Sequence, residues 1–248
     1  MIIGIIPARF ASSRFPGKPL IDIQGKSMIQ RVYEQAMKSE SLNRVVVATD
    51  DKTIHNHVIS FGGDSVMTSE RHQSGTDRCF ETLQLIEGSY QYIVNIQGDE
   101  PFLEPSQIDE LAEAMDDNVQ IVTQMIEVIN ERELFDPGEA KIVLNEKNEA
   151  MYFSRSPIPF LRNIAKEIWH LNHRYYRQVG MYGYRRDILQ EITKLPVSSL
   201  EKAEALEQLR WIQNGFKIKC ITTKYLSHCV DVPEDVDRIL RLRNENDG

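Results

Sequence analysis

The sequence predicts an α/β fold with a mostly parallel, doubly wound, Rossmann-like sheet and a smaller, mixed, β-rich part. Two observations predict it. In the first half of the chain, apolar runs typical of buried strands alternate with segments of helical periodicity. In the second half, strand-like runs follow one another with few helices between them. The length of 248 residues and the 41% hydrophobic content are enough for one large domain with a sizeable insertion.

In the first half, strand-like and helix-like runs alternate. The strand-like runs are residues 2–6, 45–48, 92–96 and 121–128. The helix-like runs are residues 28–39, 52–61, 76–86 and 106–115. In this order at least one helix-like run lies between each pair of successive strands, which favours parallel pairing with helices on both faces of the sheet.

In the second half, the strand-like runs are residues 140–144, 151–154, 175–184 and 217–222. A helix is expected over residues 198–214, because Ser198 and Glu201 have the spacing of a capping box and Gly215 is a typical stop. Residues 233–243 are expected to form the last helix, with a proline at its first position and acids in its first turn.

Composition narrows the classes of partner. The net charge of -8 argues against a nucleic-acid-binding surface. Cys79, Cys220 and Cys229 match no metal-binding spacing and leave an odd thiol if two are paired, which favours a reducing compartment. No apolar run reaches the length of a membrane span, and the first six residues are too short for a signal peptide. We therefore expect a cytoplasmic protein without a membrane partner.

The most informative segment follows the first strand, at the edge where open α/β sheets bind ligands. It runs from Pro7 through a Pro16-Gly17 turn to Lys18, and it lacks both the Walker A and the dinucleotide-binding glycine patterns. Fixed cations and exposed backbone N–H groups suit a polyphosphate; a solvated basic loop is the alternative. Its candidate phosphate-binding residues are Ala8, Arg9, Ser12, Ser13, Arg14 and Lys18.

Acidic residues at three places compete for a metal role. Asp99 follows a buried strand and a glycine, so it can reach the ligand edge as a Mg²⁺ ligand or act as a turn former. Asp51 is better explained as the N-cap of the helix that starts at residue 52. Asp231 has capping-box spacing to Glu234, which favours a structural cap, although one carboxylate can both cap and coordinate.

Other polar positions are less specific. His72 precedes a helix start and is assigned no catalytic role. Ser74 either caps that helix or hydrogen-bonds a base edge. Arg155 ends a strand, where it suits a carboxylate ligand about as well as it suits solvent. No Ser/His/Asp or Cys/His nucleophile arrangement is present in the sequence.

Eight motifs in register make the chain resemble the 3-deoxy-manno-octulosonate cytidylyltransferases, from about residue 2 to residue 237. They are the first loop, Ala48-Thr49-Asp50-Asp51, Ser74-Gly75-Thr76-Asp77-Arg78, Gln97-Gly98-Asp99-Glu100-Pro101, Tyr152-Phe153-Ser154-Arg155, Gly180-Met181-Tyr182-Gly183-Tyr184-Arg185, Leu206-Glu207-Gln208-Leu209-Arg210 and Val230-Asp231-Val232-Pro233-Glu234-Asp235. Each motif is weak alone, but eight in order are specific.

The resemblance implies a fold of the nucleotidyltransferase type, usually homodimeric, which transfers CMP from CTP to an acidic keto-sugar for lipopolysaccharide synthesis and requires Mg²⁺. It implies a single domain, with a nucleotide-binding part at about 1–130 and 215–248 and a sugar-binding and dimerisation part at about 131–214. By position, the first loop would hold the CTP phosphates and Ser74 and Gln97 would lie near the cytosine. Lys18, Asp99 and Asp231 would be catalytic, and the two aspartates would hold Mg²⁺. The sugar pocket would contain Arg155, Gln178, Tyr182, Glu207 and Gln208.

Two positions depart from the family pattern. Val232 stands where the family usually has threonine, which matters little if Asp231 coordinates the metal. Gln178 stands where the family usually has a histidine near the sugar. This leaves open a related acidic sugar, such as an 8-amino octulosonate or a nine-carbon keto acid, and, as a separate class, a non-catalytic nucleotide-binding homologue.

Overall fold

A computed structural model of the chain describes residues 1–11, 15–72, 74–226 and 229–246. The chain divides into two compact units. Unit 1 comprises Met1–Ala112 and Tyr225–Gly248, and unit 2 comprises Glu113–Lys224. The predicted α/β class with a mainly parallel sheet is confirmed, and each unit is described by itself below.

Unit 1 is built on four parallel strands in the order β6-β1-β4-β5. These are β1 (Ile2–Ala8), β4 (Arg44–Thr49), β5 (Ser65–Met67) and β6 (Tyr92–Asn95). In β1, Ala8 pairs with Thr49 of β4, and Ile5 pairs with Asn95 of β6. Because all four strands run in one direction, the segments that follow them leave at the same edge of the sheet.

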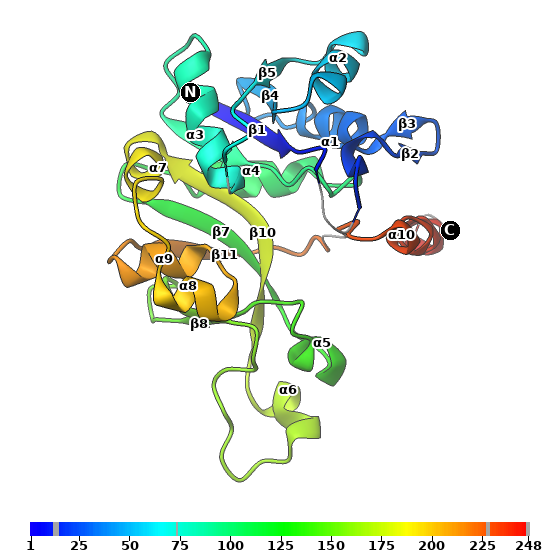
Figure 1. Ribbon diagram of the computed structural model, residues 1–248. Coiled ribbons are helices and arrows are strands. Elements are labelled where there is room, and N and C mark those ends of the chain that lie inside the picture. The colour runs from blue at the N-terminus through cyan, green and yellow to red at the C-terminus, as the bar shows by residue number, and fades with distance from the viewer. Residues whose placement is uncertain (12–14, 73, 227–228, 247–248) are drawn as a thin grey trace. The chain divides into compact units, whose positions relative to one another are not determined.

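Helices separate these strands as the alternation predicts (Figure 1). They are α1 (Met28–Ala36), α2 (Lys52–Ser60), α3 (Gly75–Leu85), α4 (Pro105–Glu113) and α10 (Pro233–Asn246). Asp51 is the N-cap of α2, since its carboxylate accepts hydrogen bonds from the backbone N–H groups of Thr53 and Ile54. The prediction of Asp51 as a cap is therefore confirmed.

Three short strands of unit 1 were not expected. β2 (Asp22–Ile23) and β3 (Lys26–Ser27) form a separate two-stranded hairpin. β5 is three residues long and none of its residues is fully buried, so it has no continuous apolar run that a sequence pattern could detect.

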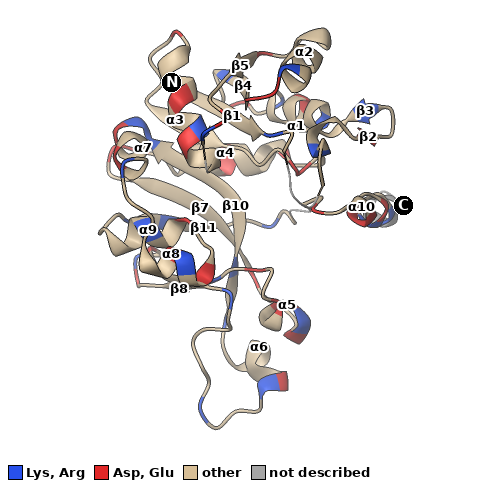
Figure 2. Cartoon of the chain, viewed as in Figure 1, with Lys and Arg blue, Asp and Glu red and all other residues tan. Residues whose placement is uncertain are grey.

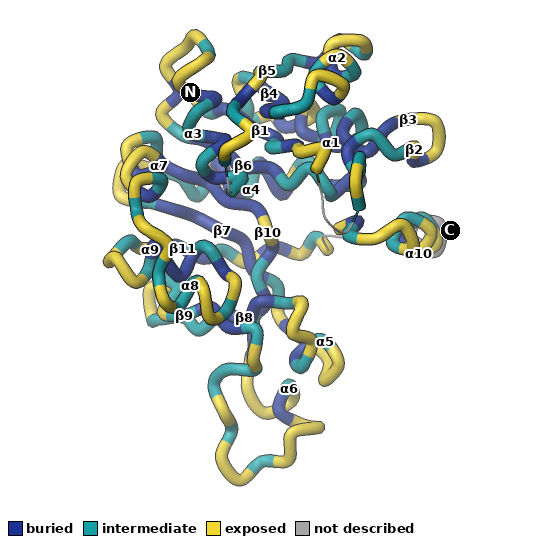
Figure 3. The backbone as a smooth tube through the Cα atoms, in the orientation of Figure 1, coloured by how far each residue is buried: buried dark blue, intermediate teal, exposed yellow. Residues whose placement is uncertain are grey.

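Unit 2 contains a mixed sheet. Its strands are β7 (Ile121–Glu127), β8 (Lys141–Leu144), β9 (Ala150–Ser154), β10 (Tyr176–Arg185) and β11 (Ile218–Thr222). β7 pairs parallel to β11 and antiparallel to β10. β10 pairs with β8, and β8 with β9, in antiparallel fashion. The strand interiors are largely buried in both units (Figure 3).

The helix expected over residues 198–214 is wrong as one element. The structure has α8 (Ser199–Glu204) and α9 (Gln208–Gln213), separated at Ala205, which adopts a left-handed conformation with φ of 52°. The predicted capping box of Ser198 and Glu201 is present. Arg155 donates to the carbonyl oxygens of Glu204 and Ala205, which a continuous helix would use for its own hydrogen bonds.

Short helices also lie between the strands of unit 2, more than the sequence indicated. They are α5 (Glu131–Phe135), the 3₁₀ turn Lys166–Ile168, α6 (Trp169–Asn172) and α7 (Arg186–Ile192). Basic and acidic residues are interspersed along the chain (Figure 2). Within the residues that the structure describes, no helix combines the length and the apolar character that crossing a membrane requires.

Candidate functional site

The first loop is fixed by a turn at Gly17. Its backbone N–H donates to the carbonyl oxygen of Phe10 at 3.0 Å, and its φ of 70° lies in the left-handed region that favours glycine. Lys18 then begins a 3₁₀ turn, Lys18–Leu20. The turn that the Pro16-Gly17 pair predicted therefore exists. Arg9 is exposed at the start of the loop, whereas Ser12, Ser13 and Arg14 lie outside the described residues.

The loop after β6 packs directly on the end of β1. A Cβ atom at Gly98 would lie 2.9 Å from the carbonyl oxygen of Pro7, a distance too short for any side chain. Glycine at this position therefore lets two backbones meet at the ligand edge of unit 1. The close approach fixes the start of the segment that carries Asp99.

The ammonium group of Lys18 lies among oxygen atoms from two distant segments. Its Nζ donates to Asp99 Oδ2 at 2.8 Å and to the carbonyl oxygen of Val230 at 2.9 Å. Asp231 Oδ1 lies 3.6 Å from the same nitrogen. The structure thus brings together the three residues predicted to be catalytic.

The segment around Val230 is held in place by the core and by the backbone. Val230 is fully buried in a cluster with Ile23, Met28 and Ile239. Its backbone N–H donates to the carbonyl oxygen of Asp99 at 2.9 Å. These contacts place the following residue, Asp231, beside Lys18.

The carboxylate that receives backbone hydrogen bonds at the start of α10 is that of Asp235. Its Oδ2 accepts from the N–H groups of Asp231 and Val232 at 2.8 and 3.0 Å. The Asp231 carboxylate lies toward Lys18 instead. The Asp231 carboxylate therefore lies where it can contact a cation.

The oxygen atoms around Lys18 Nζ are of the kind that a hard divalent cation takes as ligands. Nζ contacts three oxygen atoms, two from carboxylates and one from a carbonyl group. Mg²⁺ prefers one or two carboxylates, with phosphate oxygens and water completing its shell. The side chains of Asp99 and Asp231 are 24% and 46% exposed, so solvent or a ligand can reach them.

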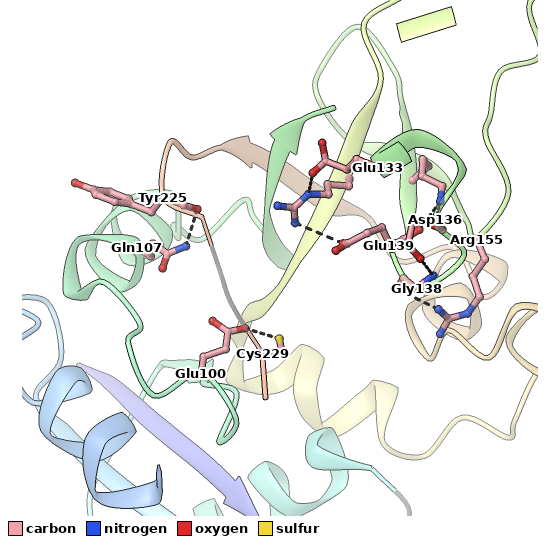
Figure 4. A network of polar contacts seen from close by, with 11 residues as sticks. Glu100, Gln107, Glu133, Asp136, Gly138, Glu139, Arg155, Tyr225 and Cys229 are labelled. Atoms are coloured by element: carbon pink, nitrogen blue, oxygen red, sulfur yellow. Dashed lines mark hydrogen bonds and ion pairs between the residues drawn. The ribbon is translucent and has the colours of Figure 1, made fainter. Parts of the chain in front are cut away.

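Two further groups lie at this site and were not predicted. Ligand atoms of Asp99, Glu100 and Cys229 lie within 4.8 Å of one another. The Cys229 thiol donates to Glu100 Oε1 at 3.6 Å, and Glu100 is only 2% exposed (Figure 4). Glu100 adjoins Asp99 in the sequence, which is a usable signal, but nothing local points to Cys229.

The residues predicted to lie near the cytosine come from α3 and from the loop after β6. Ser74 is the N-cap of α3, and its hydroxyl accepts from the backbone N–H of Asp77 at 3.1 Å. A built Cβ at Gly75 would lie 3.6 Å from Asn95 Nδ2. Asn95 Oδ1 is buried without a hydrogen-bond partner among the described residues. Gln97 is partly exposed two residues later.

In unit 2, hydrogen bonds connect Gln178 of β10 with Gln208 of α9 and Thr123 of β7. Gln208 Nε2 donates to Gln178 Oε1 at 2.7 Å, and Gln178 Nε2 donates to Thr123 Oγ1 at 3.4 Å. Thr123 Oγ1 itself donates to the carbonyl oxygen of Met181 at 2.8 Å, where the pairing of β10 with β7 shifts register. These bonds define the orientation of the Gln178 amide.

Tyr182 and Glu207 lie close to this group. Burial raises the pKa of Tyr182 well above its ordinary value, and its hydroxyl has no hydrogen-bond partner among the described residues. The Tyr182 hydroxyl therefore stays neutral at physiological pH. Glu207 Oε1 lies 3.8 Å from Arg210 Nη2, and Arg210 also binds Glu201 at 2.6 Å.

The Arg155 guanidinium donates hydrogen bonds to backbone carbonyl oxygens. Its Nε donates to the Glu204 carbonyl oxygen at 2.7 Å, and its Nη1 donates to the Pro137 carbonyl oxygen at 2.8 Å. Nη1 also donates to the carbonyl oxygen of Gly138 at 3.3 Å (Figure 4). The buried Lys141 donates to the carbonyl oxygens at the two ends of the same turn, residues 136 and 139, at 2.6 Å. Arg155 therefore joins this turn to the segment that leads to Glu207 and Gln208.

Comparison with known sequences gives a consistent result. The sequence profile of the family described as "Cytidylyltransferase" matches residues 3–218. A 3-deoxy-manno-octulosonate cytidylyltransferase of Parabacteroides distasonis is 53% identical, with 96% of each chain covered. The enzyme of the same name from Escherichia coli is 42% identical, with 96% of this chain and 94% of the relative covered.

Solved structures agree with the sequences. A CMP:2-keto-3-deoxy-manno-octonic acid synthetase complexed with CTP superposes with a TM-score of 0.90 at 40% identity, covering 99% of both chains. A 4-diphosphocytidyl-2C-methyl-D-erythritol synthase from Anaerococcus prevotii has a TM-score of 0.62 at 12% identity, which shows a shared fold alone.

Proposed function

The chain belongs to the cytidylyltransferase family, among the 3-deoxy-manno-octulosonate cytidylyltransferases, and from this premise we propose that it transfers CMP from CTP to the anomeric hydroxyl of 3-deoxy-manno-octulosonate, releasing pyrophosphate. One observation carries the proposal: the match with the CTP-complexed synthetase extends over 99% of both chains with a TM-score of 0.90. Identities of 42–53% to relatives of one name support the same substrate class.

We propose that unit 1 binds the nucleotide. Ala8 ends β1 at the ligand edge of the parallel strands, Arg9 and Lys18 lie on the first loop that follows it, and Ser12, Ser13 and Arg14 belong to the same loop in sequence. Cationic side chains there neutralise the triphosphate and stabilise the pyrophosphate as it leaves. Ser74 and Gln97 are proposed to face the base.

Unit 2 is proposed to supply the sugar contacts. Gln178, Tyr182, Glu207 and Gln208 lie together on β10 and α9, and the neutral Tyr182 and the two amides offer hydrogen bonds to hydroxyl groups. Arg155 is proposed to bind the sugar carboxylate with its remaining donor capacity or to hold the pocket in shape through its carbonyl contacts.

Mg²⁺ is the proposed cofactor, held by Asp99 and Asp231, and when bound it would neutralise phosphate charge and lower the pKa of the attacking hydroxyl. The chain's own residues orient the reactants so that the anomeric oxygen attacks the α-phosphorus in line with the leaving pyrophosphate. One P–O bond forms, one P–O bond breaks, and the hydroxyl proton passes to solvent. Such transfer depends on positioning and charge neutralisation and needs no covalent enzyme intermediate.

The proposal extends to the cellular role. A CMP-activated octulosonate is consumed in lipopolysaccharide synthesis, and we expect the reaction in the cytoplasm, where CTP is made. A homodimer is expected from the family resemblance. Among the acidic sugars that Gln178 leaves open, 3-deoxy-manno-octulosonate is favoured over its 8-amino analogue, because Gln178 Oε1 already accepts from Gln208 and is less available to an amino group.

A pyrophosphate-release assay tests the proposal. Purified protein is incubated with CTP, Mg²⁺ and a panel that includes 3-deoxy-manno-octulosonate, its 8-amino analogue and a nine-carbon keto acid. The octulosonate is expected to give the highest kcat/KM. A higher kcat/KM for the amino sugar would overturn the substrate assignment, and no release with any acid sugar would indicate a non-catalytic nucleotide-binding protein.

A further inference from the structure

We propose that the ammonium group of Lys18 is an internal occupant of the divalent-cation site, so that the cation and a triphosphate bind cooperatively. The inference rests on the proposed function and adds a regulation of that site. It predicts that the cation binds poorly until a triphosphate withdraws Lys18 from Asp99 and Asp231.

The geometry around Lys18 is that of a bound cation. Nζ contacts Asp99 Oδ2 at 2.8 Å, the Val230 carbonyl oxygen at 2.9 Å and Asp231 Oδ1 at 3.6 Å. An ammonium group has three N–H donors and no acceptor, and here it faces three oxygen atoms. These are the same kinds of oxygen ligand that Mg²⁺ takes.

Lys18 and a metal ion cannot share this position. Mg²⁺ holds its ligands at about 2.0–2.1 Å, so an ion bound between the two carboxylates would lie close to the nitrogen, with strong repulsion. The Lys18 side chain is 16% exposed, which weakens the screening of that repulsion by water. Entry of the ion therefore requires that Lys18 leave.

A bound triphosphate would offer Lys18 other oxygen partners. The residue follows the Gly17 turn, on the loop proposed to hold the triphosphate, and its long stem allows the ammonium to move without a change in the backbone. A triphosphate that attracts Lys18 frees the two carboxylates for the ion. Linkage then requires that the ion increase triphosphate affinity by the same factor.

Replacement of Lys18 tests the inference without turnover. Mn²⁺ serves as the probe, and its free concentration is followed by electron paramagnetic resonance in the absence of nucleotide. Lys18→Met keeps the length of the side chain and removes its charge. Lys26→Met is the matched control, because Lys26 pairs with Glu34 at 2.5 Å on the surface of the same unit.

We expect Lys18→Met to bind Mn²⁺ roughly tenfold more tightly than the wild type, and Lys26→Met to be unchanged. Adding Asp99→Asn to Lys18→Met should abolish the gain. Equal or weaker Mn²⁺ binding by Lys18→Met overturns the inference, provided that thermal melting shows a folded protein. If Lys18→Met is unfolded, the same measurement is made on Lys18→Gln.

A second readout follows Lys18 itself. In protein labelled with ¹⁵N-lysine, the Nζ signal that disappears in Lys18→Met is assigned to Lys18. Saturating Mg²⁺ should shift this signal in the wild type but not in Asp99→Asn. A signal that Mg²⁺ leaves unchanged overturns the inference, while pyrophosphate release by the wild type would still support the proposed function, so the two failures are distinguishable.

Discussion

Gln208 Nε2 donates a hydrogen bond to Gln178 Oε1 at 2.7 Å, which joins α9 to β10. The pairing of these two amides gives Gln178 a defined orientation. The family resemblance implies a histidine at this position, whereas the Gln178 amide offers a donor and an acceptor without a titratable group.

Gln178→His should change the KM of the sugar and leave the affinity for CTP unchanged. Histidine can carry a positive charge near neutral pH, since its ordinary pKa is about 6.5, whereas glutamine is always neutral. We therefore expect the wild type to show a weaker pH dependence of sugar KM below pH 7 than the variant. Steady-state kinetics with each substrate varied in turn measures both effects.

Much of this arrangement follows from local patterns. The capping box of Ser198 and Glu201 was predictable because both residues lie in one helical turn. The meeting of Lys18 with Asp99 was predictable because segments that follow parallel strands share one edge. The break at Ala205 was not, because it depends on Arg155, which is 50 residues away and contacts the Ala205 carbonyl oxygen. Cys229 was missed for the same reason, since its partner Glu100 is 129 residues away.

Lys18→Ala should reduce turnover far more than stability. The lost contact is one to the charge that develops on the leaving pyrophosphate, worth about 2–4 kcal/mol by analogy with an oxyanion donor. This corresponds to a loss of roughly 30-fold to 1,000-fold in kcat. Parallel measurement of kcat and of the melting temperature checks the prediction, and wild-type turnover in a folded variant would remove Lys18 from the mechanism.

Asp99→Asn and Asp231→Asn should each abolish Mg²⁺-dependent turnover, because one hard cation requires charged oxygen ligands. Asp231 is the more informative case. The backbone hydrogen bonds at the start of α10 go to Asp235, so Asp231→Asn should change the melting temperature little. A protein that keeps its turnover but melts at a lower temperature would show that Asp231 has a structural role instead.

The three cysteines should differ sharply in alkylation by iodoacetamide. Cys79 and Cys220 are buried, and burial raises the pKa of Cys220 to about 12, so neither should react at pH 8. Cys229 is exposed as a residue, but desolvation of its sulfur and the carboxylates of Glu100 and Asp99 raise the pKa of its thiol well above the ordinary value. The thiolate fraction of Cys229 is therefore small at pH 7 and increases with pH. Labelling at this single residue should be slow at pH 7 and faster at pH 9. Mass spectrometry of digested protein locates the label, and faster reaction at Cys220 would contradict the burial.

Arg155→Met should lower stability and raise the sugar KM together, if Arg155 positions the pocket. Its guanidinium donates to the carbonyl oxygens of Pro137, Gly138, Glu204 and Ala205. Only the bond to Glu204 is partly buried and water can replace the other three, so the expected cost is about 1–3 kcal/mol. Arg174→Met is the control, because that side chain is 68% exposed and its replacement should cost little stability.

The two roles of Arg155 are distinguished by measuring kcat/KM with a sugar analogue that lacks the carboxylate. If Arg155 binds the carboxylate, the variant and the wild type should use that analogue equally well. If Arg155 positions the segment before Glu207 and Gln208, the variant should remain worse with the analogue as well, and this is the result that the carbonyl contacts lead us to expect.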